Sequence, residues 1–313
     1  MVGYTRTTKA VRQYLQASLA SNTLKAYASD LKRFKAWGGT VPATPNEVAR
    51  YLATAAAELR PSTLARQLAA IGYAHEMRGL VSPTKSALVR RTMKGIRRAK
   101  GVAQKQASPI APAILRRVVR PLRCLSAAQN ERDAALFLLA FAGGFRRSEI
   151  GALQVGDVEF TPRGVLIQLR RSKTDQVQRG RDVAIPRTPD AAQCPVRALR
   201  RWLTTLSSLP TRGKGSSPTS SLFCRIDRHG YACGALSGAS VGWLLRKRLA
   251  LHALPVDGYS AHSLRAGLVT SAFRAGAPIW AIQRQTGQRS ESTVHRYIRG
   301  LNAFECNAAA RVL

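Results

Sequence analysis

The sequence predicts a mainly α-helical protein of two domains, with one small antiparallel β-sheet in the second domain. Three observations support this prediction. Apolar residues recur at spacings of three and four through most of the first hundred residues, which is the period of a helix. A polar segment at 100–108, read as an interdomain linker, lacks this period, and two strand-like apolar runs flank a polar turn at 172–180. The 313 residues, 45% of them hydrophobic, can form sizeable cores.

The first domain, residues 1–105, is predicted to be a compact unit of four helices. The first helix follows Ser21-Asn22-Thr23. The second begins at Thr44-Pro45-Asn46-Glu47, where Thr44 is suited to cap the helix and proline to occupy its first turn. The third begins at Pro61, and the fourth covers roughly 85–99. The outer face of the fourth helix is basic and also includes Arg91; its candidate DNA-binding residues are Arg90, Lys94, Arg97 and Arg98.

The second domain, residues 106–313, is predicted to be mostly helical around a buried central helix that covers 130–142 and stops at Gly143-Gly144. The two strand-like runs form a small hairpin. A loop rich in serine, proline and glycine covers 207–220. Further helices are expected at 111–120, 237–251, 260–275, 278–286 and 290–299.

The charge of the chain indicates a polyanionic partner. Basic residues number 50 and acidic residues 16, which gives a formal net charge of +34. The excess is found in both domains: residues 1–105 carry 19 basic and 4 acidic side chains, and the remainder lie in 106–313. Charge spread in this way favours nucleic-acid binding by both domains over a single basic tail.

Several other classes of protein are disfavoured. The five cysteines are dispersed without a CxxC pair, which argues against a zinc site and suits a reducing cytoplasm. No P-loop or carboxylate cluster is present, so we expect neither a nucleotide nor a metal cofactor. The amino terminus lacks a signal-peptide core, and the longest apolar run is too short to cross a bilayer.

Two short motifs combine residues suited to phosphate chemistry. His262 and Arg265 are three apart at the start of a predicted helix and therefore share a face. A guanidinium group binds phosphate oxygens in a forked geometry, and an imidazole can move a proton near neutral pH. Arg146 and Glu149 are also three apart, directly after Gly143-Gly144. Taken alone, each motif is a weak signal, and an incidental surface pair is the favoured interpretation.

Two further residues complete the candidate set. Lys173 lies at the predicted hairpin turn, where a lysine can donate a proton to a leaving alkoxide. Tyr297 lies on a short helix between Arg296 and Arg299. Taken alone, the lysine suggests only a solvated turn and the tyrosine only a packing residue. Their order along a chain of this charge favours attack by a tyrosine oxygen on a DNA phosphodiester.

The ordered set Arg146, Lys173, His262-x-x-Arg265 and Tyr297 resembles the tyrosine recombinase (phage integrase) family. The segments GFRRSEI, HSLRAG and VHRYIR look like its three signature boxes, and the match covers most of 107–300. The four-helix domain resembles the core-binding domain of the family, and the layout is closest to two-domain Cre-like and Xer-like members. The resemblance implies a catalytic domain at 106–313.

The resemblance also implies a mechanism and partners. We expect Tyr297 to form a 3′-phosphotyrosine while Arg146 and Arg265 neutralise the transition state, Lys173 protonates the 5′-oxygen and His262 assists the tyrosine or orients the phosphate. Glu149 is expected to brace this set from behind. The implied partners are double-stranded DNA with an inverted-repeat site and three further copies of the chain, which form a tetramer on two DNA sites.

One position departs from the family pattern. Where the family usually has histidine or tryptophan, nine residues before the tyrosine, this chain has Gln288. Its amide can donate a hydrogen bond but cannot carry a proton. Two alternatives therefore remain open beside a site-specific recombinase: a catalytically impaired DNA-binding protein of recombinase fold, and a type IB topoisomerase-like nicking-closing enzyme.

Overall fold

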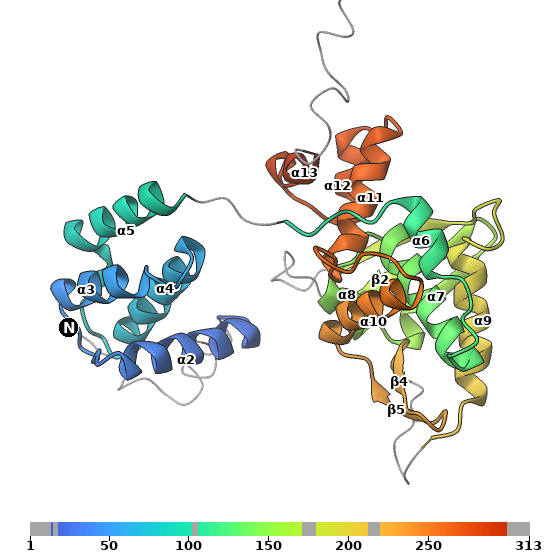
Figure 1. Cartoon of the computed structure of the whole chain (residues 1–313), viewed down its shortest axis with the longest axis horizontal. Helices are drawn as coiled ribbons and strands as arrows, with labels where there is room; N and C mark the ends of the chain where they lie inside the picture. Colours follow the sequence, from blue (N-terminus) through green and yellow to red (C-terminus); the bar gives the residue numbers. More distant parts are fainter. Residues whose placement is uncertain (1–13, 15–17, 102–105, 171–179, 212–219, 299–313) are drawn as a thin grey trace, which may run out of the picture. The chain divides into compact units, whose positions relative to one another are not determined.

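A computed structural model describes residues 14, 18–101, 106–170, 180–211 and 220–298. The chain divides into two compact units, Met1–Lys105 and Gln106–Leu313, each with its own hydrophobic core (Figure 1). Both units are predominantly helical, as the sequence predicts. No helix among the described residues is long and apolar enough to span a membrane.

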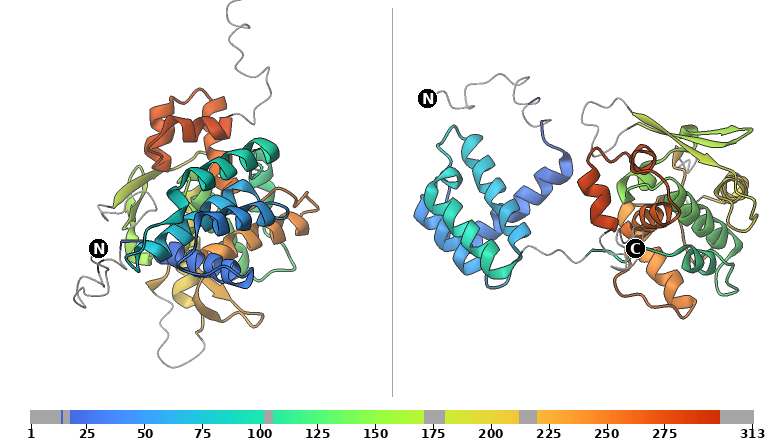
Figure 2. Two further views of the ribbon diagram at one scale, coloured as in Figure 1. Left: turned by 90° about the vertical axis from the view of Figure 1, so that its left-hand side faces the viewer. Right: turned by 90° about the horizontal axis from the view of Figure 1, so that it is seen from above.

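The first unit is a bundle of the four predicted helices (Figure 2). The capping box at Thr44 is present: its hydroxyl accepts the Glu47 N–H at 3.2 Å, and Glu47 Oε2 accepts the Thr44 N–H at 3.4 Å. Phe34, Tyr51 and Leu64 lie at the centre of the core. The elements are α2 (Ser21–Ala36), α3 (Pro45–Ala55), α4 (Pro61–Glu76), the 3-10 helix η2 (Pro83–Lys85) and α5 (Ala87–Lys100).

Helix α5 separates apolar from basic residues. Val89 and Met93 are buried in the core of the first unit. The basic residues of the opposite face are all exposed, as the sequence predicts: Arg90, Arg91, Lys94, Arg97 and Arg98. None of these five side chains forms an ion pair with another described residue. This face is therefore available to an external polyanion.

The second unit is built around α7 (Ala127–Ala142), which is buried on nearly all sides and packs against α9 and α11. This confirms the predicted central helix. Around it lie, in chain order, α6 (Pro112–Val118), α8 (Arg147–Ala152), η3 (Val155–Asp157), β1 (Val158–Thr161), β2 (Gly164–Leu169), β3 (Arg181–Pro186), α9 (Pro195–Ser208), β4 (Cys224–Ile226), β5 (Ala232–Ala235), α10 (Gly238–Leu251), α11 (His262–Arg274), α12 (Ile279–Thr286) and α13 (Glu291–Ile298).

The predicted hairpin is present as β2 and β3, which pair antiparallel with Val165 opposite Ile185. Strand β1 extends it to a three-stranded sheet in the order β1-β2-β3, and β4 and β5 form a second antiparallel pair. The sequence analysis did not predict β1, β4, β5 or α9. The apolar residues of α9 do follow a helical period, and Leu199, Trp202 and Leu206 are buried.

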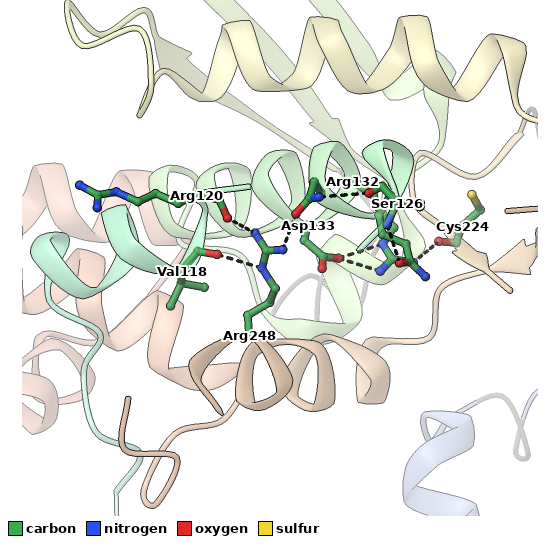
Figure 3. Close-up of polar contacts among 9 residues, drawn as sticks. Val118, Arg120, Ser126, Arg132, Asp133, Cys224 and Arg248 are labelled. Atoms are coloured by element: carbon green, nitrogen blue, oxygen red, sulfur yellow. Dashed lines mark hydrogen bonds and ion pairs between the residues drawn. The ribbon is translucent and has the colours of Figure 1, made fainter. Parts of the chain in front are cut away.

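A buried polar network fastens α10 to α6 and α7 (Figure 3). Arg248 is fully buried and donates to Val118 O at 3.0 Å, to Asn130 Oδ1 at 2.7 Å and to Arg120 O at 2.7 Å. Beside it, Arg132 pairs with Asp133 at 2.7 Å. Because each guanidinium nitrogen of Arg248 donates to an acceptor, this charge is accommodated within the core.

Three of the expected features lie partly or wholly outside the described residues. They are the linker 100–108, the hairpin turn 172–180 with Lys173 and the loop 207–220.

Candidate active site

The turn between α7 and α8 places Arg146 at the site. Gly144 adopts φ +56°, and a Cβ there would lie 2.8 Å from Thr286 Cγ2, so both conformation and space require glycine. Arg146 precedes α8, and the buried Glu149 fixes it twice. The Arg146 N–H donates to Oε2 at 2.8 Å, and Nη1 donates to Oε1 at 2.6 Å. Glu149 therefore holds both the main chain and the guanidinium group of Arg146.

Arg265 lies on α11 and is 2% exposed. Its Nη1 donates to Gly144 O at 2.6 Å and to Thr286 O at 2.8 Å, and these carbonyls belong to the turn after α7 and the end of α12. Burial, followed by the positive charge of Arg146, lowers the pKa of Arg265, whereas Tyr297 and Glu149 oppose this shift. The arginine remains cationic because its ordinary pKa lies far above neutral.

Tyr297 and His262 are in direct contact. The tyrosine hydroxyl lies 2.6 Å from Nε2 of His262, and the two ring centroids are 5.4 Å apart. Helix α13 reaches this position because Val294 packs into a small core with Val269 and Ile282, where Tyr297 contributes part of its own surface. A tyrosine in this position is at hydrogen-bond distance from a potential base.

The surroundings of His262 favour its neutral form. Partial burial of the imidazole, followed by the positive charges of Arg265, Arg146 and Arg147, lowers the pKa of His262 below its ordinary value of 6.5. A neutral imidazole at neutral pH can accept the proton of the Tyr297 hydroxyl.

Gln288 presents an unused donor. It lies two residues after α12, where Gly287 ends the helix with φ +66°, and its side chain is 6% exposed. Its Oε1 accepts from Thr286 Oγ1 at 3.1 Å, and its buried Nε2 has no hydrogen-bond partner within the part of the chain that the structure describes. An unsatisfied buried N–H is costly, so an acceptor supplied by a ligand fits this position.

The structure brings together five of the six residues proposed as catalytic: Arg146, His262, Arg265, Gln288 and Tyr297. Gln288 joins them through Thr286, whose carbonyl binds Arg265 and whose hydroxyl binds Gln288. Lys173 lies outside the described residues. Sequence reasoning missed Arg181 of β3, whose charge interacts with Arg146 and Glu149. Its position directly after the predicted hairpin turn was a weak signal, because no sequence pattern distinguishes it from the neighbouring arginines.

The assembled site carries a surplus of positive charge. In addition to burial, the positive charge of Arg146 lowers the pKa of Arg181, of Arg265 and of His262, and Arg265 lowers that of His262 as well. The negative charge of Glu149 raises the pKa of Arg181 and of Arg265. Repulsion among these arginines is unfavourable in the free protein. An anion such as a phosphodiester removes that cost when it binds, which makes the site complementary to the charge of a pentavalent phosphorus.

Comparison with known proteins agrees with the fold and site. The model described as "Phage integrase family" matches residues 114–303, and that of "Phage integrase, N-terminal SAM-like domain" matches residues 11–77. An integrase/recombinase xerD homolog from Selenomonas ruminantium is 38% identical over 312 residues, which cover 97% of this chain and 89% of the relative.

Two more distant matches extend this comparison. Recombinase cre of Escherichia phage P1 is 28% identical over 87% of this chain and 80% of its own length. The Tn1549 transposon integrase, solved in complex with transposon right end DNA, matches with a TM-score of 0.62 at 16% identity over 97% of both chains. At that identity the structural match shows the shared fold.

The chain therefore belongs to the phage integrase family, whose members are tyrosine recombinases. It is a tyrosine-type, site-specific DNA recombinase.

Proposed function

We propose that Tyr297 is the nucleophile that cleaves one DNA strand at a recombination site. The observation that carries this proposal is the 2.6 Å contact between its hydroxyl and His262 Nε2, next to the buried Arg265. The tyrosine oxygen attacks the phosphorus, the bond to the 5′-oxygen breaks, and a 3′-phosphotyrosine forms. Attack by a 5′-hydroxyl reverses this step, so the phosphodiester energy is conserved without a nucleotide cofactor.

The other residues have separate roles in this proposal. Arg146 and Arg265 bind the non-bridging oxygens and stabilise the added charge of the transition state. His262 accepts the tyrosine proton or orients the phosphate. Lys173 delivers a proton to the leaving 5′-oxygen, and Gln288 donates its free amide N–H to the phosphate. Glu149 keeps Arg146 in place through the two hydrogen bonds described above.

The proposed partner is double-stranded DNA that carries an inverted-repeat site. The unit 1–105 clamps the DNA, with α5 as its basic contact, and the unit 106–313 cuts it. Contacts of the exposed arginines and lysine of α5 to phosphates fix the register without reading bases. We propose that the protein acts as a tetramer on two DNA sites, in the cytoplasm and in association with the bacterial nucleoid when it is bound to DNA.

Covalent capture tests the proposal. The full-length protein is incubated with nicked duplexes that contain the DNA flanking its gene and a pool of randomised half-sites. Denaturing electrophoresis then separates covalent adducts, and mass spectrometry maps the linkage. We expect a phosphodiester adduct on Tyr297, and none from Tyr297→Phe. An adduct that persists in this variant overturns the assigned nucleophile.

Binding and strand exchange on the same duplexes are measured beside adduct formation. Wild-type protein that binds these duplexes without forming an adduct behaves as a catalytically silent DNA-binding protein and overturns the proposed cleavage. Protein that forms the adduct and relaxes supercoils, but never exchanges strands between two duplexes, behaves as a topoisomerase. Exchange between two labelled duplexes, with Holliday-junction intermediates, is the expected result.

A further inference from the structure

Arg181, the first residue of β3, binds the end of helix α12. Its Nη1 donates to Gln285 O at 3.0 Å and lies 3.4 Å from Arg284 O. A second contact joins the same two elements, because Gln285 Nε2 donates to Ala184 O of β3 at 3.1 Å and to Ala142 O at 2.9 Å. The last turn of α12 is therefore tied to the sheet and to the end of α7.

The guanidinium group of Arg181 also lies against Gly287. A Cβ at this position would meet Nε of Arg181 at 2.8 Å and Cζ at 3.0 Å, so the group packs on bare backbone directly before Gln288. Gly287 has φ +66°, and its N–H donates to Gln283 O at 2.7 Å. The direction in which the chain leaves α12, and so the position of Gln288, depends on this contact.

This position is electrostatically unfavourable for an arginine in the free protein. Burial, with a further contribution from Arg146, lowers the pKa of Arg181, and Glu149 opposes the shift. Nε and Nη2 are buried and lack a hydrogen-bond partner among the described residues. Leaving two buried donors unsatisfied costs stability, so core packing does not account for an arginine here.

Two arginines together bind the carboxyl end of α12. Arg181 reaches Arg284 O and Gln285 O, and Arg265 binds Thr286 O at 2.8 Å. These carbonyls carry the partial negative charge of the helix end, which attracts cations. Gln288 follows two residues later, so the same two side chains that hold the helix end also define where its amide lies.

We propose that Arg181 is a positioning residue for strand cleavage, which acts through Gly287 to hold Gln288 in place. The proposal rests on the assignment of Gln288 as a phosphate-binding residue. Arg181 makes no contact with the reacting atoms in this role. Because a displacement of about 1 Å in a catalytic group can lower a rate by about 100-fold, loss of this contact is expected to affect cleavage more than DNA binding.

A double-mutant cycle tests the coupling. Single-turnover adduct formation is measured for the wild type, Arg181→Ala, Gln288→Ala and the double variant. Arg181→Ala is expected to slow cleavage about 10-fold or more, with DNA affinity within about threefold of the wild type. In the Gln288→Ala background the same change is expected to cost no more than about twofold, because the residue through which it acts is gone. Full additivity of the two losses overturns the proposal.

The matched control is Arg187→Ala, which removes an exposed positive charge just after the same strand. Its cleavage rate is expected to remain within about twofold of the wild type, because an exposed charge contributes little. Arg181→Gln keeps a side-chain N–H for Gln285 O and serves as a second variant for the cycle. If Arg187→Ala slows cleavage as much as Arg181→Ala, the effect is one of general charge and the proposal fails.

Hydrogen exchange tests the positioning without catalysis. The amides of Gly287 and Gln288 both donate to Gln283 O, so they report directly on the end of α12. Exchange at 287–288 is expected to accelerate in Arg181→Ala and not in Arg187→Ala. Unchanged exchange overturns the inference even if cleavage falls. A wild type that forms no adduct refutes the proposed nucleophile instead, while the exchange result still decides the role of Arg181.

Discussion

Arg248 and Arg265 are both buried arginines of the second unit, and burial lowers the pKa of each. Arg248 donates through Nε, Nη1 and Nη2 to three protein acceptors. The negative charge of Asp133 attracts its guanidinium group and raises its pKa, against the effect of burial. Arg265 binds two backbone carbonyls through Nη1, its side chain also hydrogen-bonds Tyr297, and its charged neighbours include the repulsive Arg146.

The difference separates a structural arginine from one that we propose is catalytic. In the network around Arg248, acceptors and a carboxylate within the protein compensate the charge. Around Arg265 the charge is only partly compensated, and the tyrosine and the buried amide of Gln288 lie beside it. A buried arginine without full compensation is favoured only when an external anion completes the site.

The largest expected effect is the loss of cleavage rate when Arg265 is replaced. Arg265→Ala removes a transition-state contact and is expected to lower the single-turnover cleavage rate by about 100- to 1000-fold. Because most binding energy comes from phosphate contacts elsewhere, DNA affinity should change much less. Quench-flow kinetics and filter binding on the same duplex measure both quantities. Equal losses in rate and affinity would show that Arg265 serves ground-state binding.

Arg248→Met is expected to lower the stability of the protein and to leave its cleavage rate unchanged. It removes the donor from the Val118 and Arg120 carbonyls and one of the two donors to Asn130 Oδ1, and we expect a loss of about 3 kcal/mol in the free energy of unfolding. Urea denaturation followed by circular dichroism measures this loss, and the cleavage rate of the folded fraction should stay unchanged. Arg246→Met, which removes an exposed arginine of α10, is the matched control. Similar stability for both variants would contradict a structural role for the network.

The pH dependence of cleavage tests the state of His262. The pKa of His262 is lowered from its ordinary value of 6.5, so the neutral imidazole is favoured at neutral pH and gains a proton as the pH falls through the lowered pKa. If it is the base, the cleavage rate is flat near neutral pH and declines on acidification, and His262→Gln is about 100-fold slower without this decline. An acid limb that remains in the variant would assign the proton transfer to another group.

The smallest expected effect concerns exposed charge on α5. Lys94→Gln is expected to reduce the slope of log K against log salt concentration by about one, with similar loss on all DNA sequences. Fluorescence anisotropy at several salt concentrations measures the slope. Lys35→Gln, an exposed lysine on α2, is the control outside the proposed contact face. Equal changes in both variants would remove the special role given to α5.

Local sequence signals predicted much of the fold. Thr44 and Glu47 indicated the start of α3, and Gly143-Gly144 indicated the end of α7, because capping and helix termination depend on neighbouring residues. Strands β1, β4 and β5 were missed, since short strands of three or four residues carry little periodic signal. Their pairing is decided by contacts that are distant in the sequence.

The candidate site shows the same division. Sequence order and residue type identified Arg146, His262, Arg265 and Tyr297 as one chemical set, because nucleophile, base and phosphate-binding groups must occur together. Arg181 carries no such signal. Its role follows from a guanidinium group that meets a glycine more than a hundred residues later, which no local pattern encodes.

The sequence by itself determined which chemistry the protein has available: the tyrosine, the histidine, the arginines and the positive charge that attracts DNA. Only the tertiary structure decided that Glu149 holds Arg146, that His262 touches Tyr297 and that Gln288 keeps a donor free. The physical reason is that residue types set charge and hydrogen-bonding capacity, whereas burial and distance decide which of those capacities are already satisfied within the protein.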